Sequence, residues 1–356
     1  MNHFRRSAHH PSPARRRLGI GLIVVGAAFL AARLFDGSGT AQARGDDRRV
    51  TQRELSEDLV LTHSVPSGGS YTLQLDQGEI QVVPTDGREA RLVVELDEGR
   101  PESLIVKDES GPEGVRLSLE GRGNGGWLGG WFSSSDRHDK GDGDDVSIAG
   151  AVLELPRGVD LHLATGAGDL DLADLDGSLK ASTGAGNVAI DHCRGHVRLS
   201  TGAGDVTVSS PGGEVDVKTG AGDLLVSDTT GQDVTLRTGA GSIQVAGNVA
   251  RCSASTGMGS IEADLDGLTG DTQLKTGMGS VSVSLGAGVS ANISAGSGMG
   301  DVSLHSGDGS RIESQHGERL KAQVGSADIE LRVSTGMGSI EVVSEAPVRQ
   351  RRGQAL

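Results

Sequence analysis

Short runs in which apolar and polar residues alternate recur along the last two thirds of the chain. In the segment 169–174, Leu170 and Leu172 fall on one side of an extended strand and the aspartates fall on the other. After a glycine at Gly177, the segment 178–183 alternates in the same way. A period of two is typical of β-strands, so each unit is expected to contain two short strands joined by turns.

A four-residue turn motif, TGxG, separates these strands and recurs at a nearly constant interval. The copies begin at Thr165, Thr183, Thr201, Thr219, Thr238, Thr256, Thr276, Ser297 and Thr335. The last interval, from Ser297 to Thr335, is about twice as long as the others and corresponds to two units with a degenerate unit between them. Self-similarity at such a period indicates a repeat protein.

A single strand of this kind cannot bury its apolar side, but copies stacked in parallel can. The pattern therefore predicts an all-β fold, a single-stranded parallel β-helix (β-solenoid) with about 18–20 residues per rung. With strands about 4.8 Å apart, about ten rungs would form a rod on the order of 45–50 Å long. We expect the solenoid to span 65–345, with a glycine- and aspartate-rich loop insertion at 121–145. The segments 75–96, 114–121 and 150–166 carry the same alternation.

The third residue of the motif is alanine in the first five copies and methionine in the last four. Because methionine is a flexible side chain that fills gaps, this column is expected to point inward, into a cross-section that widens toward the C-terminus. Cys252 has the inward parity of Ala254 and is expected to be a small core residue. Cys193 is expected in a turn about three layers away, too far for a disulfide between the two.

Residues 1–43 have the features of a signal peptide or a signal anchor. Arginines precede an uncharged apolar stretch at 18–32, and Ala41 and Ala43 form an A-x-A cleavage site. Without cleavage, residues 18–35 are just long enough to anchor the chain in the cytoplasmic membrane. Either outcome predicts export, to the periplasm, the cell envelope or the cell surface.

The charge of the chain narrows the classes of partner. The formal net charge is −15, and residues 1–43 contribute +5 from six arginines and one aspartate, so the remaining chain carries −20. Such an excess disfavours nucleic acid and anionic lipid headgroups. We expect no nucleic-acid partner, and membrane contact only through an uncleaved N-terminal segment. A charged linker is expected at 44–64 and a basic, disordered tail at 346–356.

The glycine-rich motif also suggests two binding chemistries, phosphate and calcium. A phosphate loop needs one glycine-rich turn between a strand and a helix, whereas these copies precede strands. Calcium-binding β-rolls have a similar repeat length, but an inward aliphatic residue stands here at their ligand position. The acidic residue falls directly after the last glycine, as at Asp169 and Asp205, where a side chain that bonds its own backbone is favoured. We therefore expect turn residues rather than a metal site, and no cofactor.

Polysaccharide-cleaving enzymes are another class to consider, because many of them are β-helices. Their sites combine carboxylates with each other or with Arg or Lys, beside aromatic side chains that stack on sugars. After the leader, four aromatic residues remain: Tyr71, Trp127, Trp131 and Phe132. His162, His192 and His196 have neither ligand nor triad spacing and are expected to be exposed. We expect no catalytic residues.

The repeat does not account for the segment GGWLGGWFSSS at 125–135. Large apolar side chains in a glycine-rich loop either cover the open N-terminal end of the solenoid or form an exposed anchor for a partner. The candidate partner-binding residues are Trp127, Leu128, Trp131 and Phe132.

The chain resembles the bacterial putative-adhesin family of domains of unknown function. The resemblance rests on the leader, on the GEIQV strand at 78–82 and on the serial TGAGDV, TGAGSI and TGMGSI turns, and it covers roughly residues 65–345. It implies a right-handed single-stranded β-helix in an envelope protein. For some members of the family, the resemblance implies a membrane-anchored protein that is a neighbour of stress-sensing systems. The resemblance implies no catalytic residues.

Together these features predict an exported, non-enzymatic β-solenoid that serves as a binding, adhesion or structural module of the cell envelope. Its partner would be an envelope protein or a glycan. Two alternatives stay open. One is an enzyme that acts on an envelope or extracellular polysaccharide, and the other is an accessory protein of envelope-stress signalling, which rests on the family resemblance alone.

Overall fold

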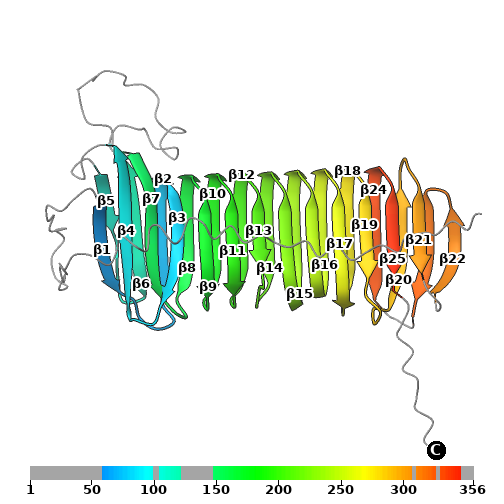
Figure 1. The fold of residues 1–356 in the computed structure, drawn as a ribbon, viewed down its shortest axis with the longest axis horizontal. Coiled ribbons are helices and arrows are strands. Elements are labelled where there is room, and N and C mark those ends of the chain that lie inside the picture. The colour runs from blue at the N-terminus through cyan, green and yellow to red at the C-terminus, as the bar shows by residue number, and fades with distance from the viewer. Residues whose placement is uncertain (1–57, 99–103, 122–146, 307–309, 326–328, 346–356) are drawn as a thin grey trace, which may run out of the picture. The chain divides into compact units, whose positions relative to one another are not determined.

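The computed structural model describes residues 58–98, 104–121, 147–306, 310–325 and 329–345. These residues belong to the compact unit Val50–Leu356 and form 25 strands of one continuous sheet. No helix long and apolar enough to cross a membrane occurs among them. The predicted all-β solenoid is confirmed (Figure 1).

The strands form two series that face each other across the core, and the chain alternates between them along the parallel rungs from β7 to β21. The first series, in the order in which neighbours pair, is β5 (Leu104–Asp108), β6 (Gly114–Gly121), β2 (Ser70–Gln77), β8 (Asp160–Ala167), β10 (Leu179–Ala185), β12 (Val197–Ala203), β14 (Val215–Ala221), the second halves of β15 (Leu224–Ala240) and β16 (Ile243–Met258), β18 (Thr272–Met278), β24 (Glu330–Met337), β20 (Ala291–Ser297), β23 (Arg319–Val324) and β22 (Ser310–His316).

The second series contains the other strand of each rung. In the order of pairing it is β1 (Asp58–Ser64), β4 (Glu89–Glu98), β7 (Ser147–Pro156), β3 (Glu79–Thr85), β9 (Leu170–Leu175), β11 (Val188–Cys193), β13 (Val206–Ser209), the first halves of β15 and β16, β17 (Ile261–Leu268), β19 (Val281–Leu285), β25 (Ile340–Ser344) and β21 (Val302–Ser306).

Neighbouring rungs are stacked in register, so equivalent residues of successive repeats form columns. Leu179 lies opposite Val197, and Thr183 of the same strand lies opposite Thr201, so each residue faces its equivalent in the next copy of the motif. The longer unit before Thr276 keeps this register, because Thr256 lies opposite Thr276. The predicted rung length is therefore confirmed.

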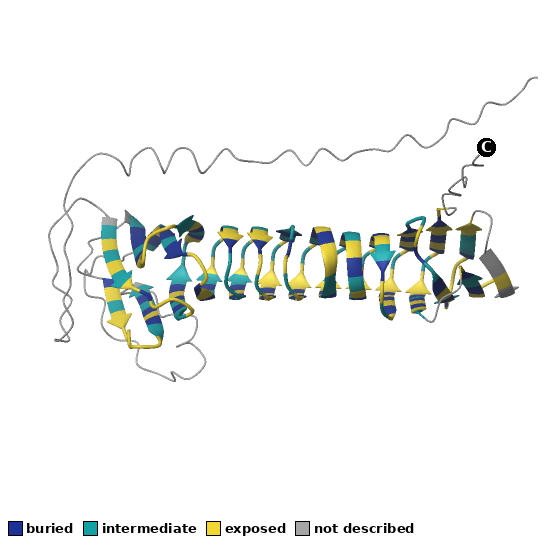
Figure 2. Ribbon diagram, turned by 90° about the horizontal axis from the view of Figure 1, so that it is seen from below, coloured by how far each residue is buried: buried dark blue, intermediate teal, exposed yellow. Residues whose placement is uncertain are grey.

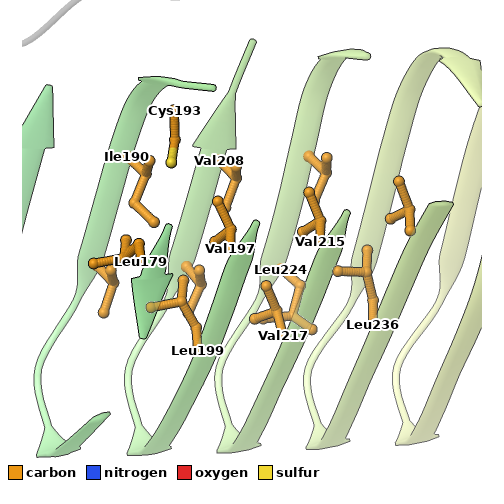
Figure 3. Packing of buried hydrophobic residues seen from close by; sticks show 14 of the residues in the cluster. Leu179, Ile190, Cys193, Val197, Leu199, Val208, Val215, Val217, Leu224 and Leu236 are labelled. Carbon is orange, nitrogen blue, oxygen red and sulfur yellow. The ribbon is translucent and has the colours of Figure 1, made fainter. Parts of the chain in front are cut away.

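Apolar columns fill the space between the two series. In β10, Leu179 is buried and the next residue, Lys180, is exposed, and buried and exposed positions alternate in this way along the stack (Figure 2). Side chains such as Val197 of the first series meet Ile190 and Val208 of the second series inside the rungs (Figure 3). Each fully buried aliphatic side chain contributes about 1.5–3 kcal/mol, so the interior is the main source of stability.

The TGxG turns stack directly on one another, and this stacking dictates their sequence. The last glycine of each copy has a φ between +136° and +148°. At Gly204, with a φ of 141°, an added Cβ would lie 2.0 Å from the carbonyl oxygen of Gly186 in the neighbouring turn. The buried threonine ties the same turns together, since Thr256 Oγ1 donates to the carbonyl oxygen of Gly241 at 2.8 Å. The last glycine is thus required for close backbone contact between rungs, and the hydroxyl group at the first position reinforces that contact.

The prediction that the methionine column points inward is wrong. The exposed fractions of Met258, Met278, Met299 and Met337 are 52%, 43%, 66% and 46%. The alternation of the strand ends at the buried threonine of the motif, where the chain bends around the corner of the rung. The alternation of inward and outward residues along the strand therefore does not continue to the third residue of the turn. This residue projects outward.

The C-terminal rungs are not stacked in chain order. β24 lies between β18 and β20, and β25 lies between β19 and β21, so the last repeat of the sequence is inserted between two earlier ones. The degenerate unit in the long last interval forms the antiparallel hairpin of β22 and β23, which pairs with β20. Apolar and polar residues alternate in this unit as in a pair of strands, but the unit lacks a TGxG turn. It therefore caps the first series instead of adding a parallel rung.

Antiparallel strands also close the N-terminal end. β1 pairs with β4, β4 with β7, and β5 with β6, all antiparallel. The sheet therefore begins at residue 58, inside the predicted linker at 44–64, whose alternating residues 58–64 form an edge strand. The remainder of that linker, the predicted leader at 1–43 and the predicted tail at 346–356 lie outside the described residues.

Candidate functional site

The residues that follow the TGxG turns bond to the next rung rather than to their own turn. Asp169 Oδ1 accepts a hydrogen bond from the backbone nitrogen of Asn187 at 2.7 Å. The same contact joins Asn187 to Asp205 at 3.0 Å, and Asp205 to Asp223 at 2.8 Å. The expectation that these side chains bond their own backbone was wrong. They form a ladder that secures one turn to the next.

An open groove of about 430 Å³ crosses four neighbouring strands of the first series, β15, β16, β18 and β24, and reaches Glu214, which directly precedes β14. Its floor contains the buried residues Val234, Cys252 and Thr272. Thr272 Oγ1 accepts a hydrogen bond from the backbone nitrogen of Cys252 at 3.1 Å, which holds the floor together. The short polar side chains of Thr235 and Ser253 line the groove beside it.

Charged side chains surround this floor. They are Glu214, Asp233, Arg251, Asp271, Glu330 and Arg332. Arg251 donates two hydrogen bonds to Asp233, at 3.2 and 2.7 Å, and this contact raises the pKa of Arg251. Arg332 is paired with Glu330. Each arginine thus has one carboxylate partner, and the four carboxylates and two arginines leave the groove with a net charge of −2.

A second polar cluster, which was not predicted from the sequence, lies at the N-terminal end of the sheet. His63 Nε2 of β1 lies 3.0 Å from Asp108 Oδ2 of β5, so the contact joins the edges of the two series. Burial raises the pKa of Asp108, but hydrogen bonds from Ser110 and His63 outweigh it and leave the pKa lowered. Burial, followed by the charge of Asp108, raises the pKa of the fully buried Tyr71. The geometry indicates a structural closure of this end.

The residues singled out from the sequence do not converge. His192 Nδ1 lies 2.8 Å from Asp191 Oδ1, and His196 Nδ1 lies 3.9 Å from Glu214 Oε2. His162 is exposed on β8, in another rung. Within the described ranges, no three His, Cys, Asp or Glu side chains are placed to hold a metal ion. The tryptophan loop at 121–145, with its candidate residues Trp127, Leu128, Trp131 and Phe132, lies outside the described residues apart from residue 121.

A comparison with protein-family models identifies the family of this chain. The family model described as Toastrack DUF4097 matches residues 152–343, more than half of the chain. The chain belongs to the Toastrack family. The match covers most of the parallel rungs and includes the groove. A Toastrack domain fits a non-enzymatic binding module.

Solved structures similar to this Toastrack protein include two from bacteria. One is described as a putative cell adhesion protein from Clostridium sporogenes, with 13% identity and a TM-score of 0.20, and the match covers 81% of this chain and 99% of that one. The other is described as a putative adhesin from Bacteroides fragilis, with 12% identity and a TM-score of 0.32, and the match covers 80% of this chain and 96% of that one. No curated protein matches the chain.

The two thiols of the Toastrack protein are predicted to be unreactive in the native state. Cys252 is buried in the core as expected, and Cys193 is also buried, at the end of β11 rather than in an open turn. Burial raises the pKa of Cys193 to about 11 and that of Cys252 to about 12. Since the thiolate is the nucleophile, a thiol reagent near neutral pH should modify neither cysteine until the protein is unfolded with denaturant. Rapid modification of the native protein would contradict this burial.

Proposed function

We propose that this chain is an exported, non-enzymatic binding module of the cell envelope, and that the groove on the first series binds a basic segment of an envelope protein. The observation that carries the proposal is the charge of the groove, four carboxylates against two arginines that are already paired. The leader at 1–43 supports export.

The construction of the groove suits binding by a preformed surface. Its walls come mainly from four strands whose residues are fixed in register by the sheet, and its floor belongs to the core. A partner would therefore meet charges that need little rearrangement, which reduces the entropic cost of association. Complementary charge would also speed the encounter and set the register of the partner.

A protein partner suits the groove better than a sugar. Sugar-binding sites use aromatic side chains for stacking, and Tyr71, the one aromatic residue among those described, is fully buried. The polar walls instead offer carboxylate oxygens, which accept hydrogen bonds from lysine and arginine. Trp127, Leu128, Trp131 and Phe132 are proposed as a second contact for the same partner, since tryptophan is a common anchor at interfaces.

Neutralising the groove is expected to weaken partner binding. The variant Glu214→Gln with Asp271→Asn removes two negative charges, and we expect the affinity for a partner captured from envelope extracts to fall about tenfold. The dependence of binding on salt should weaken as well.

The matched control places the same kind of change on the opposite series. Glu262 and Glu341 are exposed on β17 and β25, so Glu262→Gln with Glu341→Gln should leave both binding and thermal stability unchanged. Equal loss in both double variants, or full binding by the groove variant, would contradict the proposal.

A further inference from the structure

Four of the five methionines of this chain recur at one place on the surface. The sequence has five, and apart from Met1 all of them occupy the third position of a TGxG turn. They are Met258, Met278, Met299 and Met337, and each is at least 43% exposed. These apolar side chains point outward at the same position of each turn, so packing in the core does not explain them. Their placement suggests a function at the surface.

These four residues form an unbroken row on consecutive rungs. Met258 lies opposite Met278, and Met278 lies opposite Met337. On the far side of Met337, the carbonyl oxygen of Met299 accepts a hydrogen bond from the backbone nitrogen of Gly338 at 2.9 Å. The inserted C-terminal repeat is what makes the row continuous, because it places Met337 between the turns of Met278 and Met299. We call this row the methionine ladder.

The spacing of the ladder brings thioether sulfurs within reach of one ion. Adjacent strands lie about 4.8 Å apart. A metal–sulfur bond is about 2.3 Å long, so two sulfurs on opposite sides of one ion are about 4.6 Å apart. Flexible methionine side chains on neighbouring rungs need only a small tilt to reach that separation. The flanking glycines, such as Gly277 and Gly279, place no side chain over the row.

Nearby residues favour a soft ion over a hard one. Two positions after the methionine, Ser260, Ser280 and Ser339 stand where the alanine-containing rungs have mainly Asp or Asn, and Asp301 is the exception at the end of the row. Thioethers select soft ions, whereas carboxylates select hard ones. We propose that the methionine ladder is a binding site for a soft monovalent metal ion, Cu(I) or its analogue Ag(I).

The test titrates the full-length protein with Ag(I) by calorimetry, and with Cu(I) in anaerobic competition against a chromogenic chelator. Both titrations use a Cys193→Ala, Cys252→Ala background, so that thiols cannot contribute. We expect saturable binding, and its loss in the variant Met258→Leu, Met278→Leu, Met337→Leu. Leucine keeps the surface apolar and removes the sulfur, so unchanged binding by this variant would overturn the proposal. Absence of saturable binding by the methionine protein would also overturn it.

Position along the ladder gives a second comparison. Met278 and Met337 each have a methionine neighbour on both sides, whereas Met258 has one and Ala240 on its other side. Met337→Leu should therefore weaken Ag(I) binding more than Met258→Leu, and the reverse order would contradict a shared site.

A measurement on the unsubstituted protein keeps the proposal testable if the leucine variant fails to fold. Exposed methionines are oxidised to sulfoxides by peroxide, and a metal bound to sulfur blocks this reaction. Mass spectrometry should show that Ag(I) protects Met278 and Met337 from peroxide. Oxidation at the same rate with and without Ag(I) would overturn the proposal.

Discussion

Replacing Gly204 with alanine is expected to destabilise the protein by about 3–5 kcal/mol. The φ of 141° at Gly204 is one that residues with a side chain rarely adopt, and the new Cβ would lie 2.0 Å from the carbonyl oxygen of Gly186. Neither the turn of Gly186 nor that of Gly204 can move aside without breaking hydrogen bonds to the next rung. Thermal unfolding followed by circular dichroism should show a fall in Tm on the order of 10 °C.

A matched control for this substitution is available in the same array. Gly288 has no atom within 4 Å of the position that a Cβ would take, and its φ is not in the positive range. Gly288→Ala should leave the Tm nearly unchanged. Equal Tm values for the two variants would show that the TGxG glycines are not held by stacking.

Removing residues 326–356 is expected to unfold the C-terminal part of the stack. This truncation deletes β24 and β25, which separate the β18 and β19 rung from β20 and β21. β21 would lose the strand with which it pairs, and β20 would keep only β23. Hydrogen exchange in residues 291–324 should become nearly as fast as in an unfolded chain, while β10 to β16 stay protected.

The control truncation removes only residues 346–356 and should leave exchange unchanged. If the repeats were stacked in chain order, the longer truncation would remove an end rung and leave residues 291–324 protected. Retained protection there would therefore contradict the inserted repeat.

Local pattern was sufficient to predict the rungs. Strand alternation and the TGxG interval depend on a few neighbouring residues, and they predicted the solenoid, its rung length and the inward position of residues such as Leu170 and Cys252. Inter-rung contacts were harder to predict. The bond from Asp169 to the next turn and the outward direction of Met258 depend on how the chain bends at the corner, which the alternation does not specify.

The order of the C-terminal rungs and the groove depend on contacts between distant segments. The strands at 272–278 and 330–337 carry the same alternation and the same TGMG turn, so local pattern does not show which of them pairs with 291–297. The groove combines Glu214 with Glu330, which lie far apart in the chain. An alignment of the repeats does place Asp233, Arg251 and Asp271 in one column before the inward residue, and that cluster of charge was a signal available from the sequence.

The proposed binding without turnover can be measured directly. Residues 44–356, which follow the predicted leader, are incubated with a panel of envelope proteins and polysaccharides, and both retained ligand and released products are quantified by mass spectrometry. A basic envelope protein is expected to be retained intact, and its retention is expected to be lost in the variant Glu214→Gln with Asp271→Asn. Release of cleaved oligosaccharide or peptide above the level of a protein-free sample would contradict the proposal.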